Sequence, residues 1–116
     1  MAGILGNRQR EKGAAVRIEW LPGAVSDLQR LREFIFPHNA DAARRAVAVI
    51  RKAVSLLHSN TFIGKPVEDL PDFRDVVVPF GSSGYVLRYR IAGDTVLIVA
   101  VKHGKEAGFA TPKDSS

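Results

Sequence analysis

The sequence predicts an α+β domain in which an antiparallel sheet carries a helical hairpin on one face. Two longer segments repeat apolar residues at helical spacing, and four shorter segments have the patterns of strands. Their order along the chain is strand, helix, helix, strand, strand, strand. Helices that are grouped together, instead of alternating with strands, are typical of α+β architecture. This arrangement leaves the other face of the sheet for a partner.

The first strand and the first helix are expected at residues 16–20 and 23–36. Apolar and charged residues alternate from Val16 to Trp20, which is the pattern of a half-buried strand. The following segment predicts a helix that ends before Pro37, because proline cannot continue a helix. One stripe of this helix carries the apolar residues Ala24, Leu28, Leu31 and Ile35.

The second helix is expected over residues 40–58, with Asn39 as its N-terminal cap. Its short connection to the first helix predicts an antiparallel pair. Its buried stripe consists of Ala43, Val47, Ile50, Val54 and Leu57. The opposite side carries Arg44, Arg45, Arg51 and Lys52, for which a solvated helix face is favoured over a nucleic-acid site.

Three strands are expected at residues 73–78, 84–91 and 95–101, the last two joined by a tight turn at Gly93 and Asp94. In the middle strand Tyr85, Leu87, Tyr89 and Ile91 share one face, and Val86, Arg88 and Arg90 share the other. The last strand is apolar at every position except Thr95, so we expect both of its faces to be covered. A helix or strand of a partner could cover the face away from the helices.

Composition limits the class of protein. The 116 residues suffice for one domain, and the net charge of +5 favours an anionic partner, either a nucleic acid or an acidic protein. There is no cysteine, which excludes disulfides, thiolate zinc sites and cysteine nucleophiles. The sequence lacks a signal peptide and an apolar run long enough for a membrane span. We therefore expect a cytoplasmic protein with no membrane partner.

Several stretches of the chain resemble the RelE/ParE toxin superfamily of type II toxin–antitoxin systems. They are residues 24–28, the loop 60–66, the run 71–74 into 82–91, and the ending 99–109. Together they place a RelE/ParE-like domain at residues 16–109, between an expected flexible leader (1–15) and a polar tail (110–116). The superfamily's fold agrees with the element order inferred from the sequence patterns.

This resemblance implies a small basic toxin that arrests growth, or stabilises a plasmid, and that a cognate antitoxin holds inactive in a hetero-oligomer. Two kinds of target divide the family. RelE-like members cut mRNA on the ribosome, whereas ParE-like members interfere with DNA gyrase. This sequence resembles the ParE-like members more closely, and a RelE-like ribosome-dependent mRNA endonuclease is the alternative.

The candidate site residues lie in the last two strands. A metal-independent ribonuclease needs an acid–base group and cations beside the phosphate. If the chain is a nuclease, these would be His103 with Arg88, Arg90 and Lys105, and the rival reading of His103 is a local hydrogen bond. If it only binds partners, the contact residues would be Arg88, Arg90, Lys102 and His103, although Arg88 and Arg90 could instead pair across strands with acids such as Asp75.

Two departures from the nuclease pattern favour binding without catalysis. The positions just before Ser82, where RelE-like nucleases often hold an arginine, carry Pro79, Phe80 and Gly81. The late tyrosine position corresponds to Phe109, which cannot exchange a proton. We therefore expect a ParE-like gyrase inhibitor that is not an enzyme and uses no cofactor or metal. His38 and His58 are interpreted as solvated or capping residues at helix ends.

Overall fold

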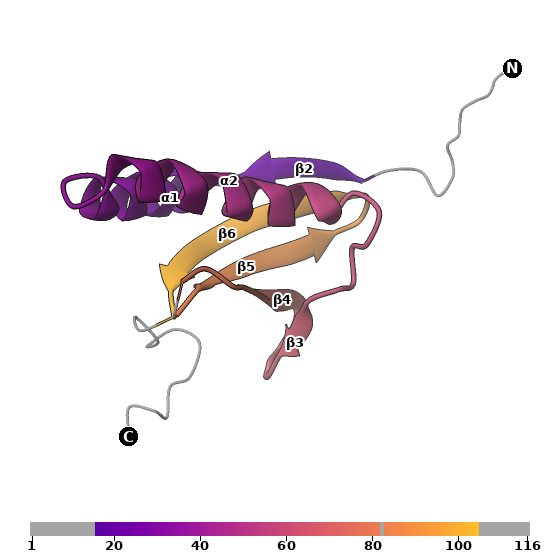
Figure 1. Ribbon diagram of the computed structural model, residues 1–116. Coiled ribbons are helices and arrows are strands. Elements are labelled where there is room, and N and C mark those ends of the chain that lie inside the picture. The colour runs from indigo at the N-terminus through magenta and orange to yellow at the C-terminus, as the bar shows by residue number, and fades with distance from the viewer. Residues whose placement is uncertain (1–15, 82, 105–116) are drawn as a thin grey trace, which may run out of the picture.

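The computed structural model describes residues 16–81 and 83–104. Two helices lie together over one face of a five-stranded sheet, which confirms the α+β fold with its helical hairpin (Figure 1). The expected leader, the tail, Ser82, Lys105 and Phe109 lie outside the described residues. In chain order, the elements are β2 (Arg17–Trp20), α1 (Pro22–Ile35), α2 (Ala40–Leu56), β3 (Lys65–Val67), β4 (Leu70–Val78), β5 (Tyr85–Ala92) and β6 (Thr95–His103).

The sheet is mixed, which corrects the expectation of a wholly antiparallel sheet. Its strand order is β2-β6-β5-β4-β3, and β2 runs parallel to β6, with Arg17 opposite Thr95 and Trp20 opposite Ile98. The other neighbours are antiparallel. Parallel neighbours need a long connection, and here both helices and strands β3, β4 and β5 lie between β2 and β6 in the chain.

The sequence patterns missed β3 and the first three residues of β4. β3 has only three residues, one of them Pro66, so it shows no alternation from which a strand could be predicted. It pairs with β4 through Lys65 opposite Asp75 and Pro66 opposite Arg74. β3 is therefore a short edge strand, where proline is tolerated because one side of the strand has no partner.

Both helices begin and end close to the predicted residues. Pro22 occupies the first turn of α1, where its missing N–H costs no hydrogen bond. The side chain of Asn39 accepts a hydrogen bond from the Ala42 backbone N–H at 2.9 Å, which confirms it as the cap of α2. Asp41 adds a negative charge in the first turn of α2, where it complements the helix dipole.

The hydrophobic core lies between the helices and the sheet. Leu31, Ile50 and Leu57 from the helical layer pack in one cluster with buried residues of β5 and β6. The β5 contribution to this cluster is Tyr85, Leu87 and Tyr89, and the β6 contribution is Val96, Ile98 and Val101. Complete burial of such side chains stabilises the fold by about 1.5–3 kcal/mol each before the entropy cost of ordering them.

A bulge in β6 decides which of its residues face the helices. Arg88 lies opposite Ala100 and Tyr89 lies opposite Ile98, so the pairing of β5 with β6 passes over Val99. As a result Ile98 and Val101 both lie in the core, although two residues separate them. The two-residue turn at Gly93 and Asp94 is confirmed, and Gly93 has a φ of 63°, a conformation that glycine adopts readily.

Tyr89 ties the sheet to the loop that follows α2. Its hydroxyl donates a hydrogen bond to the Thr61 carbonyl at 2.6 Å and accepts one from the Gly64 N–H at 2.9 Å. Arg74 donates to the Gly64 carbonyl at 2.6 Å and lies over the Phe62 ring. A Cβ atom at Gly64 would lie 2.8 Å from the Tyr89 hydroxyl, so only glycine allows this approach.

Candidate functional site

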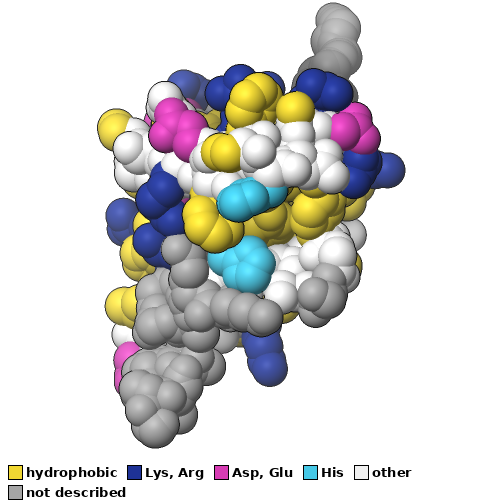
Figure 2. Space-filling view, turned by 60° about the vertical axis from the view of Figure 1, so that its left-hand side comes forward, with side chains coloured by type: hydrophobic (Ala, Val, Ile, Leu, Met, Phe, Trp, Pro, Cys, Tyr) yellow, Lys and Arg dark blue, Asp and Glu magenta, His cyan; other side chains and the backbone are white. Residues whose placement is uncertain are grey.

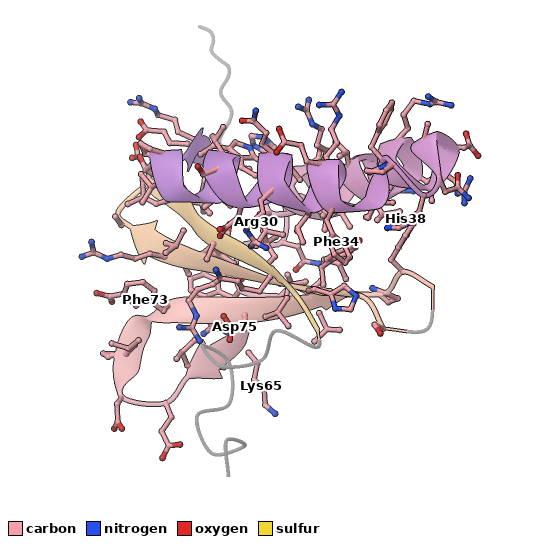
Figure 3. The ribbon with its side chains drawn as sticks, turned by 90° about the vertical axis from the view of Figure 1, so that its left-hand side faces the viewer. Arg30, Phe34, His38, Lys65, Phe73 and Asp75 are labelled. Carbon is pink, nitrogen blue, oxygen red and sulfur yellow. The ribbon has the colours of Figure 1, made fainter. Side chains whose placement is uncertain are left out.

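The face of the sheet away from the helices gathers most of the predicted site residues, and we call it the outer sheet face. Residues that pair directly across neighbouring strands point to the same face, so the register defines its members. They include Lys65 of β3, Phe73, Asp75 and Val77 of β4, Val86, Arg88 and Arg90 of β5, Leu97, Ala100 and Lys102 of β6, and Glu19 of β2, which lies opposite Leu97. Figure 3 labels Lys65, Phe73 and Asp75 on β3 and β4, below α1.

Arg88 and Asp75 form the central ion pair of this face. Arg88 Nε donates to Asp75 Oδ1 at 2.8 Å and Arg88 Nη2 donates to Asp75 Oδ2 at 3.0 Å. Their side chains are only 13% and 20% exposed, so the bidentate pair is well shielded from water. The pairing of Arg88 with Asp75 on the neighbouring strand, one of the two predicted alternatives, is thus confirmed. Two hydrogen-bond donors of Arg88 are occupied by Asp75.

Two further cations of the outer sheet face, Arg90 and Lys102, lie nearer its borders. Arg90 is exposed, and its guanidinium lies 5.9 Å from the centre of the Phe73 ring. Lys102 Nζ lies 3.6 Å from Asp27 Oδ1 of α1. Asp27 also accepts a hydrogen bond from the Val101 N–H at 3.0 Å and lies 3.5 Å from Arg30. Sequence reasoning missed Asp27 and Arg30 because nothing in their spacing indicates that α1 lies beside the end of β6.

His103 lies on the opposite face from Arg88, Arg90 and Lys102. It pairs with Tyr85, and the two rings meet edge to face with their centres 5.5 Å apart. The Phe80 ring also contacts Tyr85, with 5.8 Å between the ring centres. Neighbours in a strand point to opposite faces, so Lys102 and His103 cannot act on the same group from one side of the sheet. Lys105 lies outside the described residues.

The tyrosines are poor candidates for a general base. Burial raises the pKa of Tyr85 above its ordinary value of 10.0. Burial also raises the pKa of Tyr89, while the Gly64 N–H and the charge of Arg74 act in the opposite direction. Both phenols therefore keep their protons at neutral pH. The outer sheet face itself contains no histidine or tyrosine among its described residues.

The histidines and cations of the helical layer are surface residues, as expected. His58 Nδ1 lies 3.1 Å from the Val16 carbonyl, and His38 contacts the Phe34 ring at 6.4 Å between centres. Asp41 forms ion pairs with Arg44 and Arg45. Figure 2 shows that histidine and hydrophobic side chains share the face on the side of the helical turn, with lysine and arginine gathered beside them.

A groove of about 480 Å³ lies between the helices and β2, away from the outer sheet face. It is open, and Trp20, Leu28 and Arg51 are among the residues that line it. Sequence reasoning did not find it, because its walls come from three separate elements. Among residues 16–81 and 83–104, no three histidine or acidic side chains are grouped so as to hold a metal ion, and no helix is long and apolar enough to cross a membrane.

The chain is similar to known toxins over most of its length. Residues 18–108 match the family model described as the ParE toxin of the type II toxin–antitoxin system parDE. A relative named Toxin RelE3, from Caulobacter vibrioides, is 33% identical over 77% of this chain and 95% of its own length. Toxin RelE1 of the same organism is 32% identical over 72% of this chain and 87% of its own length.

Three solved structures have a fold similar to that of this chain. A chain of the chromosomal ParDE toxin–antitoxin system from P. aeruginosa aligns with a TM-score of 0.65 at 18% identity, covering 77% of this chain and 96% of that one. A chain of the RelBE2 toxin–antitoxin complex from Mycobacterium tuberculosis aligns with a TM-score of 0.56 at 23% identity, covering 77% and 98%. E. coli RelE, solved as a mutant in the free state, aligns with a TM-score of 0.56 at 16% identity, covering 87% and 92%.

Proposed function

Because this chain belongs to the ParE toxin family of type II toxin–antitoxin systems, we propose that it stops growth by binding DNA gyrase through its outer sheet face. Family membership shows that the chain is the toxin of such a system. Gyrase acts on DNA in the cytoplasm, so the proposal places the toxin there.

The outer sheet face supports binding without catalysis. It combines exposed Val77 and the Phe73–Arg90 stack with the shielded ion pair of Arg88 and Asp75. Aromatic residues and arginine are enriched at protein interfaces. Cleavage of RNA would also need a proton acceptor and a proton donor near these cations, and His103 lies on the other side of the sheet. This separation is the observation that carries the proposal.

An antitoxin is the second partner in this proposal. The aligned P. aeruginosa and M. tuberculosis structures are of toxin–antitoxin systems, and the net charge of +5 here suits an acidic binding segment. An antitoxin that covers the outer sheet face would keep gyrase away from it. Toxin and antitoxin would then form a hetero-oligomer in which the toxin is inactive.

A supercoiling assay with purified gyrase tests the target. Wild-type toxin should inhibit supercoiling at roughly micromolar concentration, corresponding to about −8 kcal/mol of binding free energy. Arg90→Glu should weaken inhibition about tenfold or more, because it reverses an exposed charge on the proposed interface. Arg44→Glu, an equal charge change on α2, is the control and should leave inhibition unchanged. No inhibition by the wild-type toxin would overturn the gyrase proposal.

The names of the relatives favour an alternative, a RelE-like ribosome-dependent mRNA endonuclease. In that case His103 would be the proton acceptor, working with Arg88, Arg90 and Lys105. Substituting His103→Ala should then abolish mRNA cleavage on translating ribosomes and growth arrest, while antitoxin binding persists. Unchanged toxicity of this variant, together with gyrase inhibition by the wild type, would end the alternative.

A further inference from the structure

The carboxylate of Asp27 joins α1 to the end of β6. β2 pairs with β6 only as far as Ile98, and beyond that residue α1 lies against the strand (Figure 1). A Cβ atom at Gly23 would lie 3.8 Å from the Val99 carbonyl oxygen, and the Asp27 carboxylate, about one helical turn later, accepts the Val101 N–H. The last residues of β6 therefore lie between β5 and α1.

The two oxygens of this carboxylate have different partners. Oδ2 accepts the Val101 N–H at 3.0 Å, and Oδ1 lies 3.6 Å from Lys102 Nζ and 3.5 Å from Arg30 Nη2. The side chain of Asp27 is 15% exposed and that of Lys102 is 32% exposed, so water and salt screen their attraction less than they would on an open surface. Asp27 therefore holds the backbone of β6 with one oxygen and the ammonium of Lys102 with the other.

We propose that Asp27 is a positioning residue for the outer sheet face and acts through Lys102. This role rests on the proposed binding of gyrase to that face, and it deepens it by naming a residue behind the face on which the binding depends. A lysine side chain loses much rotamer freedom when a partner orders it, and Asp27 imposes part of that order in the free toxin. An ammonium has several N–H donors, so Lys102 can bind an acceptor of gyrase while it keeps its contact with Asp27.

The rival role of Asp27 is purely structural, as the acceptor for the Val101 N–H. Asp27→Asn distinguishes the two roles, because the amide oxygen can still accept this hydrogen bond but no longer carries the charge that attracts Lys102. The matched control is Asp41→Asn on α2. Asp41 also pairs with two arginines, so its substitution makes the same change of charge at a similar array on the helical surface.

Inhibition of supercoiling by the purified toxin measures the effect. Asp27→Asn should raise the concentration for half-inhibition about fivefold, and Asp41→Asn should change it by less than about twofold. Lys102→Gln leaves the Val101 hydrogen bond in place and should raise this concentration about tenfold. If Asp27 acts through Lys102, the double variant should resemble Lys102→Gln and should not reach the roughly fiftyfold product of the single effects.

Several results would contradict this role. Wild-type inhibition by folded Asp27→Asn toxin, or by Lys102→Gln toxin, would overturn it, and so would multiplying effects in the double variant. Stronger inhibition by Asp27→Asn would mean that the carboxylate competes with gyrase for Lys102, which is the opposite of positioning. Urea denaturation establishes that each variant is folded, and Lys102→Gln keeps the test decisive if Asp27→Asn is not. If wild-type toxin does not inhibit gyrase, the gyrase proposal fails and the positioning role falls with it.

Discussion

The two faces of β5 show how one strand serves two purposes. Leu87 and Tyr89 point to the helices and have no exposed surface, whereas Val86 and Arg88, which alternate with them along the strand, are partly exposed and Arg90 is exposed. The helix side therefore contributes most of the stability, and the outer sheet face is open to partners. This difference teaches that stability and recognition can be changed separately, by substitutions at alternate positions of one strand.

The largest effect is expected from truncating the same residue type on the two faces. Val101 is completely buried on the helix side, and Val77 is 69% exposed on the outer sheet face. Val101→Ala should lower the free energy of unfolding by about 2–3 kcal/mol, since it removes buried methyl groups and leaves a cavity. Val77→Ala should lower it by less than about 0.5 kcal/mol. Urea denaturation measures both, and equal losses would remove the distinction between the faces.

The next largest effect is the difference in free energy of unfolding between variants of the two buried tyrosines. Tyr89→Phe leaves the Thr61 carbonyl and the Gly64 N–H without their partner, and should lower the free energy of unfolding by about 1–3 kcal/mol. The Tyr85 hydroxyl forms no hydrogen bond with another described residue, so Tyr85→Phe should cost less than about 0.5 kcal/mol. Chemical denaturation of the two variants tests this order. If Tyr85→Phe costs more, the loop contact of Tyr89 is not the source of its effect.

A smaller effect is expected when the coupling energy of the ion pair on the outer sheet face is compared with that of an ion pair on the helical surface. Double-mutant cycles with alanine should give a coupling energy of about 1 kcal/mol for Asp75 and Arg88, because the pair is bidentate and shielded. The exposed pair of Asp41 and Arg44 should give about 0.3 kcal/mol. Raising the salt concentration should reduce only the second value appreciably. A larger coupling on the helix would contradict the idea that the outer face is well ordered.

The smallest expected effect is the dependence of stability on pH that arises from Tyr85 and Tyr89 on the helix side. Their raised pKa values mean that the folded protein holds the two phenol protons more tightly than the unfolded chain does. Their contribution is therefore complete below about pH 10, the pKa of the unfolded chain, and is lost as the pH rises above it. Urea midpoints measured from pH 8 to pH 11 should fall only at the alkaline end. The fall should be smaller in Tyr85→Phe, and a pH-independent midpoint would contradict the burial of these groups.

Much of the fold followed from local patterns, because apolar periodicity reports which side of an element is buried. It identified α1, α2, β5 and β6 and placed Tyr85 and Leu87 on one face of β5, which is the face that lies in the core. Periodicity contains no information on pairing partners, so the parallel pairing of β2 with β6 could not be predicted from it. β3 was missed because three residues are too few to show a period.

The candidate site was less predictable than the fold. Arg88 and Arg90 were correctly placed on one face, and pairing of Arg88 with Asp75 was one of the stated alternatives. Lys102 and His103 were grouped because they are adjacent in sequence, but β6 continues to His103, so alternation places them on opposite faces. The contacts of Asp27 and the groove around Arg51 depend on how the helices lie on the sheet, which no local pattern specifies.

The hydrogen bond from Val101 to Asp27 has a consequence for solubility. β2 ends opposite Ile98, so the backbone of β6 beyond that point would otherwise be an open edge to which a strand of another molecule could add. Asp27 occupies its Val101 N–H and brings α1 alongside. At the far edge, β3 is short and contains Pro66, which has no N–H to donate. Both features hinder the addition of a strand from another molecule at these two positions, which is the step by which sheets aggregate.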